Sequence, residues 1–201
     1  MMKQTGSGAV DERRTNTREQ IRSVALEMFA ERGYGGTSLR EIAERLGVTK
    51  AAVYYHFKTK EDILVSLIED FLTQVDELLD WAQAQPGGAA TRRVVIQRYA
   101  ALLSGPAGQL ARFMQEGQAA IRELGVGQEV RKRFSRMVPL LVGDDPTAED
   151  VLRARLAMVG VHMGAFGAHL QEGGDRQLLE DPDESRAAAV RIAIELIGAG
   201  G

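Results

Sequence analysis

The stretch that most constrains the fold of this chain is residues 37–60, which read TSLREIAERLGVTKAAVYYHFKTK. Apolar residues recur there at the spacing of one helix face, at Leu39, Ile42, Ala43 and Leu46. Ser38 and Glu41 form a capping box before this face, and Gly47 follows it where a helix end favours a residue with positive φ. The pattern predicts a short helix that ends in a sharp turn.

The residues after this turn predict a second short helix. Thr49 can cap its N-terminus, and Val53 and Phe57, four residues apart, would face inward. Ala43 is small where two helices joined by so short a turn must approach closely. These residue types at these spacings are typical of a helix-turn-helix, and the alternative is an ordinary helical hairpin with a polar surface.

The outward face of the second helix suits a DNA groove. It carries Lys50, Ala51, Ala52, Tyr54 and His56, whereas Tyr55 is expected in the core. Polar side chains can donate to phosphates and base edges, and small alanines let a helix lie close to the bases. The sequence therefore favours a DNA-binding role for this helix.

Residues 29–60 resemble the DNA-binding domain of TetR-family transcriptional regulators. The matching parts are the run G-Y-x-x-T-S-x-x-x-I-A-x-x-x-G-V and the ending V-Y-Y-H-F-K-x-K-E-D-I-L. The resemblance implies base reading by Lys50, a base or backbone contact from Arg40, and phosphate contacts from Tyr54, His56 and Lys60. Thr49 is expected to cap the helix, to donate to phosphate, or both, and Ala51 and Ala52 offer methyl contacts to a base.

Charge is distributed unevenly along the chain. The net charge is −3, but residues 1–60 contain 11 Lys and Arg against 7 Asp and Glu, a balance of +4, and residues 61–201 contain 14 against 21, a balance of −7. Only the part expected to face phosphate is basic.

Composition also limits the kinds of site and the location of the protein. The absence of cysteine excludes disulfides and thiolate sites, and no apolar run is long enough for a membrane span. The N-terminus MMKQTGSGAVDERR is not a signal peptide, so we expect a cytoplasmic protein.

The helical pattern predicts an all-α fold of two parts. Residues 1–14 are expected to form a disordered arm, residues 15–60 a three-helix head, and residues 61–201 a larger helical domain for ligand binding and dimerisation. A stripe from Thr59 almost to Trp81 predicts a helix too long for the head to cover, and hence a mechanical link. Further helices are predicted near residues 91–104, 106–124, 128–142, 147–170 and 183–197, with no strand pattern.

The helix predicted at 147–170 has two apolar faces. Large residues form one, at Leu152, Leu156, Val159, Met163, Phe166 and Leu170, and small residues form the other, at Ala157, Gly160, Gly164 and Gly167. One face can pack in the domain core, and the other can meet a second subunit across a two-fold axis. The alternative is a larger monomer core. DNA binding favours the homodimer, because helix-turn-helix dimers read two related half-sites of a palindromic operator.

Apolar and sulfur-containing side chains of the larger domain suggest a cavity for a small, largely apolar effector. The candidate ligand residues are Phe113, Met114, Phe134, Met137, Met158, His162, Met163 and Phe166. Plain core packing explains the same residues equally well, and the TetR resemblance favours a pocket.

No catalytic, cofactor or metal motif is present, so an enzyme is not expected. The chain is predicted to be a ligand-released repressor; the alternative is a DNA-binding regulator controlled by a protein partner, or an activator, without a small effector.

Overall fold

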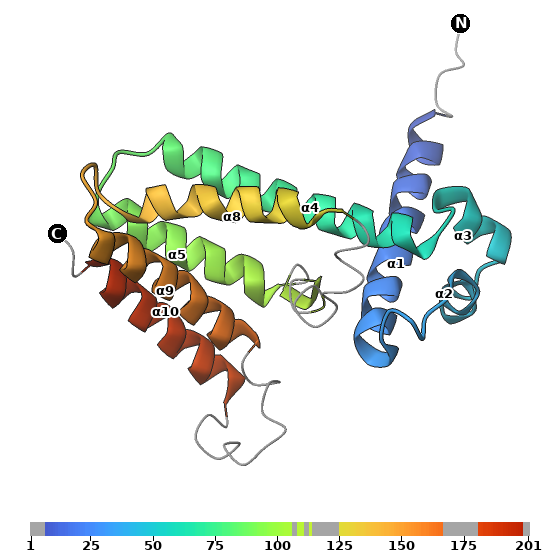
Figure 1. Cartoon of the computed structure of the whole chain (residues 1–201). Helices are drawn as coiled ribbons and strands as arrows, with labels where there is room; N and C mark the ends of the chain where they lie inside the picture. Colours follow the sequence, from blue (N-terminus) through green and yellow to red (C-terminus); the bar gives the residue numbers. More distant parts are fainter. Residues whose placement is uncertain (1–6, 106–107, 111–112, 114–124, 167–180, 199–201) are drawn as a thin grey trace, which may run out of the picture.

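The computed structural model describes residues 7–105, 108–110, 113, 125–166 and 181–198, and all regular elements within them are helices (Figure 1). The side chains of residues 7–14, 166 and 182 are outside this description. The helices are α1 (Ser7–Arg32), α2 (Leu39–Leu46), α3 (Lys50–His56), α4 (Lys60–Gln83), α5 (Ala89–Ser104), α8 (Gly127–Leu141), α9 (Ala148–Phe166) and α10 (Pro182–Gly198). The predicted all-α class is confirmed.

Helices α1, α2 and α3 form a small head at one end of the molecule (Figure 1). Its core is made by fully buried side chains from all three helices, including Ile21 and Phe29 of α1, Ile42 of α2 and Val53 of α3. Burial of about 1.5–3 kcal/mol for each large apolar side chain is what holds such short helices together, since helices of this length are marginal alone.

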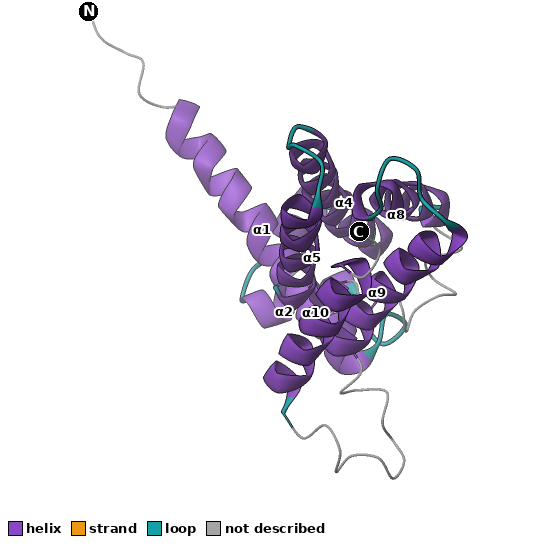
Figure 2. Ribbon diagram, turned by 90° about the vertical axis from the view of Figure 1, so that its left-hand side faces the viewer, coloured by secondary structure: helices purple, strands orange, loops and turns teal. Residues whose placement is uncertain are grey.

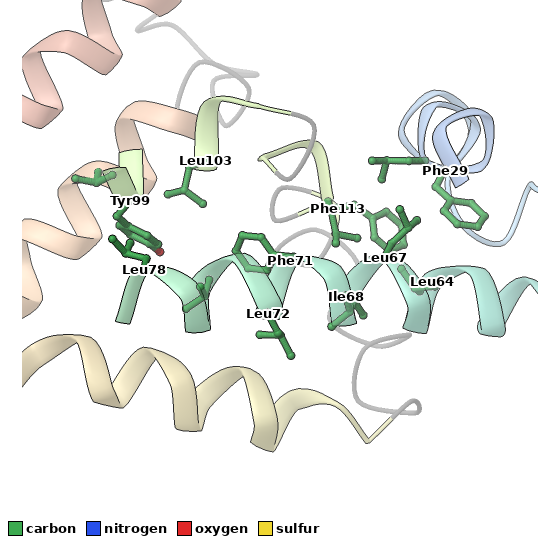
Figure 3. Close-up of a cluster of buried hydrophobic side chains, with 14 of the residues drawn as sticks. Phe29, Leu64, Leu67, Ile68, Phe71, Leu72, Leu78, Tyr99, Leu103 and Phe113 are labelled. Atoms are coloured by element: carbon green, nitrogen blue, oxygen red, sulfur yellow. The ribbon is translucent and has the colours of Figure 1, made fainter. Parts of the chain in front are cut away.

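Helix α4 begins at the head and continues into the larger domain. Thr59 and Asp62 form its capping box, with the Thr59 amide 2.9 Å from an Asp62 carboxylate oxygen. Figure 3 shows Leu64 and Leu67 of α4 near Phe29 of the head, whereas Leu78 lies near Tyr99 of α5. One continuous helix therefore contributes to the cores of both parts.

Two groups of ion pairs connect α4 to its neighbours. The guanidinium of Arg22 on α1, which is buried, donates to Asp70. Further along, Asp76 accepts from Arg133 at 2.9 Å and from Arg136 at 3.2 Å, both on α8. Helix α4 is therefore paired with α1 near the head and with α8 in the larger domain.

Helices α9 and α10 pack closely as a pair beside α5 (Figure 2). A Cβ placed at Gly164 would lie 2.3 Å from the Ala189 Cβ and 3.2 Å from the Ser185 carbonyl oxygen. Glycine is therefore required where α9 and α10 come together. Within the described residues, no helix is both long and apolar enough to cross a membrane.

The N-terminal helix differs from the expected boundaries. We predicted a disordered arm over residues 1–14, but α1 begins at Ser7. Extending an existing helix avoids the cost of nucleation, so a helix anchored at Ile21 and Phe29 can continue toward the N-terminus. Most of the helix predicted at 106–124, and the last four residues of that predicted at 147–170, lie outside the described residues.

Candidate functional site

The turn between α2 and α3 has the predicted geometry. Gly47 has φ +67°, and its amide donates to the Glu44 carbonyl at 3.2 Å. The Val48 amide donates to the Ala43 carbonyl at 3.0 Å, and the Thr49 hydroxyl caps α3 by accepting from the Ala52 amide at 3.2 Å. These local bonds close the turn and set the direction of α3 relative to α2.

One side of α3 is buried and the other is exposed. Val53 and Phe57 point into the head, as expected. Lys50, Ala51 and Tyr54 are exposed, whereas Ala52 and His56 are half-buried. The Tyr55 prediction was wrong: 61% of this residue is exposed, because a residue two positions from Val53 lies about 200° around the helix axis.

Helix α3 carries a cation–ring pair and a pair of rings outside the core of the head. The Lys50 Nζ lies 5.0 Å from the centroid of the Tyr54 ring, a cation–π distance. The Tyr55 and His56 rings meet edge to face with centroids 5.2 Å apart. The surface of α3 thus offers an ammonium, two phenol hydroxyls and an imidazole in two neighbouring pairs, which are suitable donors for phosphate oxygens and base edges.

Arg40 is exposed on the adjacent side of α2. Its Nε donates to a Glu44 carboxylate oxygen at 2.9 Å, and this hydrogen bond and charge raise the pKa of Arg40. Ion pairs exposed to solvent contribute little, so the guanidinium can exchange Glu44 for a phosphate or a guanine edge. The position is compatible with the predicted contact.

Lys60 is directed toward the loop between α1 and α2. Its Nζ donates to the carbonyl oxygens of Tyr34 at 2.8 Å and Thr37 at 3.2 Å, and lies 4.3 Å from the Tyr34 ring centroid. An ammonium has three donors, so one remains after these bonds. Lys60 therefore holds the start of α4 to this loop, in addition to any phosphate contact.

Two features of the head were missed from the sequence. Thr37 is buried, and its hydroxyl oxygen lies 3.1 Å from the Gly33 carbonyl oxygen and 3.3 Å from that of Met28, which holds the loop against α1. Tyr55 belongs to the exposed surface. The Tyr55 position could have been found, because it is four residues from Ala51 and hence on the same helix face.

Part of the predicted ligand set comes together in the core of the larger domain. The Phe134 ring lies 6.0 Å from Tyr99 and 5.8 Å from His162, measured between centroids. Met137 and Met158 are buried as well. These residues form the Tyr99–His162 cluster, defined as Tyr99, Phe134, Met137, Met158 and His162.

Hydrogen bonds define the protonation of this cluster. His162 Nδ1 lies 2.8 Å from the Met158 carbonyl oxygen, which can only accept, so Nδ1 carries the proton. Nε2 is then the acceptor for the Tyr99 hydroxyl at 2.7 Å. Burial lowers the pKa of His162 and raises that of Tyr99, and both groups are neutral as a result.

The remaining predicted ligand residues lie elsewhere. Phe113 packs against the head, with its centroid 5.7 Å from Phe29 and 6.0 Å from Tyr34. Met163 is 62% exposed on the outer side of α9, so its assignment to an interior pocket was wrong. Met114 and the side chain of Phe166 lie outside the described residues. The structure thus brings half of the set together as packed core.

The outer side of α9 is an exposed apolar face. It comprises Leu152, Leu156, Val159 and Met163. Ala154, Ala157 and Val161, on the opposite side, are buried in the domain. The two faces predicted from the sequence are thus present, and the large-residue face, here called the α9 face, has no covering element in the described residues. These described residues also contain no group of His, Asp or Glu that could hold a metal ion.

Comparison with known proteins decides the family. Residues 21–67 match the model of bacterial regulatory proteins of the tetR family. The HTH-type transcriptional regulator Mb3439c of Mycobacterium bovis is 30% identical over 167 residues, which cover 81% of this chain and 79% of that protein. The chain belongs to the TetR family.

Two further comparisons concern a relative that matches over a shorter length and a solved structure with the same fold. The HTH-type transcriptional regulator AcrR of Shigella flexneri is 42% identical over 72 residues, which cover 35% of this chain and only 34% of AcrR. The fold of FadR from Bacillus subtilis, solved with stearoyl-CoA, superposes with a TM-score of 0.60 at 22% identity and covers 91% of this chain and 98% of FadR. These relatives are transcriptional regulators, and none of their names describes an enzyme.

Proposed function

We propose that this TetR-family chain is a cytoplasmic, homodimeric repressor that binds a palindromic operator and is released from it by a small, largely apolar molecule. The observation that carries the proposal is the exposed side of α3, where Lys50, Tyr54 and Tyr55 lie on the surface together with Ala51 on a basic head. An exposed helix of this kind fits the major groove, in which each base pair presents a distinct pattern of donors and acceptors.

The head supports separate roles for its cations. Lys50 is in the first turn of α3, the end from which recognition helices contact base edges, so it would read sequence. Arg40 on α2 would contact a base or the adjacent backbone. Tyr54, Tyr55 and His56 would contact phosphates, and Lys60 would contribute its third donor while holding the loop.

The α9 face supports the homodimer. An apolar stripe on a helix is costly to leave in water, and a second copy placed by two-fold symmetry would cover Leu152, Leu156 and their neighbours with the same residues. The resulting pair of heads would carry two α3 helices related by the axis of a palindrome, with half-sites about 34–36 Å apart.

Effector control rests on two observations. FadR, which shares the fold, was solved with stearoyl-CoA, so the fold can hold a small molecule with a long apolar part. In this chain, α4 joins both cores and is attached to α8 through Asp76 and to α1 through Asp70. A ligand that prefers a shifted α4 would move the two heads apart from their operator spacing.

Selection of duplexes from a random DNA pool tests the DNA-binding part. We expect an enriched inverted repeat, and Lys50→Ala should bind this repeat more weakly. If Lys50 contacts phosphate, the variant's affinity should depend less steeply on salt concentration. If Lys50 reads a base edge, the variant should show a relaxed base preference. Lys132→Ala, which removes an exposed lysine of α8, is the matched control and should bind normally. Selection of no common sequence would contradict the proposal.

A further inference from the structure

A groove between α5, α9 and α10 is separate from the Tyr99–His162 cluster. Its volume is about 330 Å³, at the low end of the range of about 300–1,000 Å³ for small-molecule sites. Ala100, Ala101 and Ser104 of α5 line one side, and Val161 and Ala165 of α9 line another. Residues of α10 complete it, and none of the eight residues predicted for a ligand site takes part.

The groove exists because the residues between the helices are small. Ala100, Ala101, Ala165 and Ala187 all line it, and alanine side chains leave space between the helices unfilled. Gly164 draws α9 and α10 together at the adjacent turn, so the space opens on the side of α5. Unfilled apolar space of this kind favours an apolar occupant that displaces poorly bound water.

Cationic side chains border the apolar surface. Arg186 and Arg191 line the groove, and the lining residues include no acidic side chain. Arg186 donates to Asp183 in the first turn of α10 and so already has an acidic partner. Arg191 is exposed and has no acidic partner within the part of the chain that the structure describes. A planar guanidinium in this position can bind a carboxylate through two parallel hydrogen bonds.

We propose that the groove binds a single-chain amphipathic carboxylate, with its hydrocarbon chain on the alanine and valine surface and its carboxylate on Arg191. An occupied groove would shift α5 and α10 and so alter operator binding. Only this regulatory effect rests on the proposed function. Occupancy itself is independent of DNA and can be measured without it.

Calorimetric titration of the full chain with decanoate tests this binding, with decanol and decyltrimethylammonium as probes of the same chain length. We expect one decanoate for each protomer, bound about two- to fivefold more tightly than decanol, because the ion pair that its carboxylate forms with Arg191 stays exposed to water on one side. Arg191→Gln should remove most of this preference. Arg93→Gln, at an exposed arginine of α5 outside the groove, should keep it.

Filling the groove locates the bound molecule. Ala101 is exposed, so Ala101→Phe can occupy the groove without forcing apart a packed core, and it should abolish decanoate binding. Ala90→Phe, at an exposed position near the other end of α5, should bind decanoate normally, and thermal unfolding confirms that both variants fold. Equal binding of decanoate and decanol, unchanged binding by Ala101→Phe, or loss of the dimer in Ala101→Phe would overturn the proposal.

The same titration separates this inference from the proposed function. If decanoate binds as expected but does not release the operator, the groove is a binding site and the effector role is lost. If decanoate fails to bind while the protein still binds an inverted repeat, the groove proposal fails and the DNA-binding proposal remains.

Discussion

The Tyr99 and His162 side chains show how a polar pair is kept in an apolar core. The Tyr99 hydroxyl donates to Nε2, and the opposite ring nitrogen donates to the Met158 carbonyl within the same helix. Each polar atom of the imidazole thus has a partner, which offsets the loss of water. The pair also joins α5 to α9, so it specifies how these helices pack.

Removing the Tyr99 hydroxyl should destabilise the protein. Tyr99→Phe leaves Nε2 of His162 without a donor among aromatic rings, which should lower the free energy of unfolding by about 1–3 kcal/mol. Urea denaturation followed by circular dichroism measures the change. Tyr54→Phe removes an exposed hydroxyl and should change stability little. Equal stability of the two variants would show that the core bond contributes nothing.

The pKa of His162 predicts a loss of stability in mild acid. Burial lowers this pKa in the folded protein, so the unfolded chain takes up a proton first as the pH falls below about 6.5. The free energy of unfolding should therefore decrease from about pH 6.5 down to the folded pKa. His162→Gln should reduce the slope of the unfolding free energy against pH, because it removes the buried imidazole. It should not abolish the slope, because the other histidines remain. Identical slopes for the two proteins would contradict the assignment of a neutral, buried His162.

At the scale of elements, the turn between α2 and α3 depends on Gly47. Its φ of +67° is a conformation that an L-residue adopts with strain, whereas a Cβ added there would meet no atom within 4 Å. The requirement for glycine is thus one of backbone conformation and not of space. This turn fixes the angle at which α3 is presented.

Gly47→Ala should lower the free energy of unfolding by about 1–2 kcal/mol, because the left-handed conformation places the new Cβ against its own backbone. Gly35→Ala is the matched control, since Gly35 is in the same head, has no positive φ and has open space around it. Thermal unfolding should show a clear decrease for the first variant and little change for the second. A larger loss of stability in Gly35→Ala than in Gly47→Ala would exclude backbone strain as the reason for glycine at position 47.

The elements were predictable where their signals are local. The capping box at Ser38, the glycine turn and the inward pair Val53 and Phe57 all depend on residues within one or two turns of helix. Tyr55 was misplaced because its type was given more weight than its angle around α3. The start of α1 was missed because its first turns extend a helix anchored elsewhere.

The candidate ligand site was much less predictable. Tyr99 and His162 are 63 residues apart, and their bond follows from how α5 packs on α9. Nothing in the sequence separates a buried methionine such as Met137 from an exposed one such as Met163. The same apolar spacing serves core packing, an interior pocket and a subunit interface, so only the tertiary arrangement distinguishes them.

At the scale of the whole molecule, the α9 face and the exposed side of α3 belong to different ends of one chain. If the α9 face joins two copies, the position of each head is fixed through α4 and α5 relative to a common axis. DNA affinity then depends on a surface that never contacts DNA.

A charge on the α9 face tests this dependence. Leu156→Glu should convert the dimer to a monomer in light scattering, because two carboxylates related by the two-fold axis would face each other within an apolar contact. The affinity of this variant for an inverted repeat should decrease as the dimer is lost. Gln97→Glu places the same charge on an exposed position of α5 and should remain dimeric. A dimeric Leu156→Glu variant would place the interface elsewhere.

The stoichiometry of the DNA complex tests the central claim most directly. Native mass spectrometry of the protein with its selected inverted-repeat duplex should show two protomers on one duplex, and scrambling either half-site should greatly weaken the complex. A single protomer on the intact repeat, or equal binding to the scrambled duplex at the same salt concentration, would contradict it.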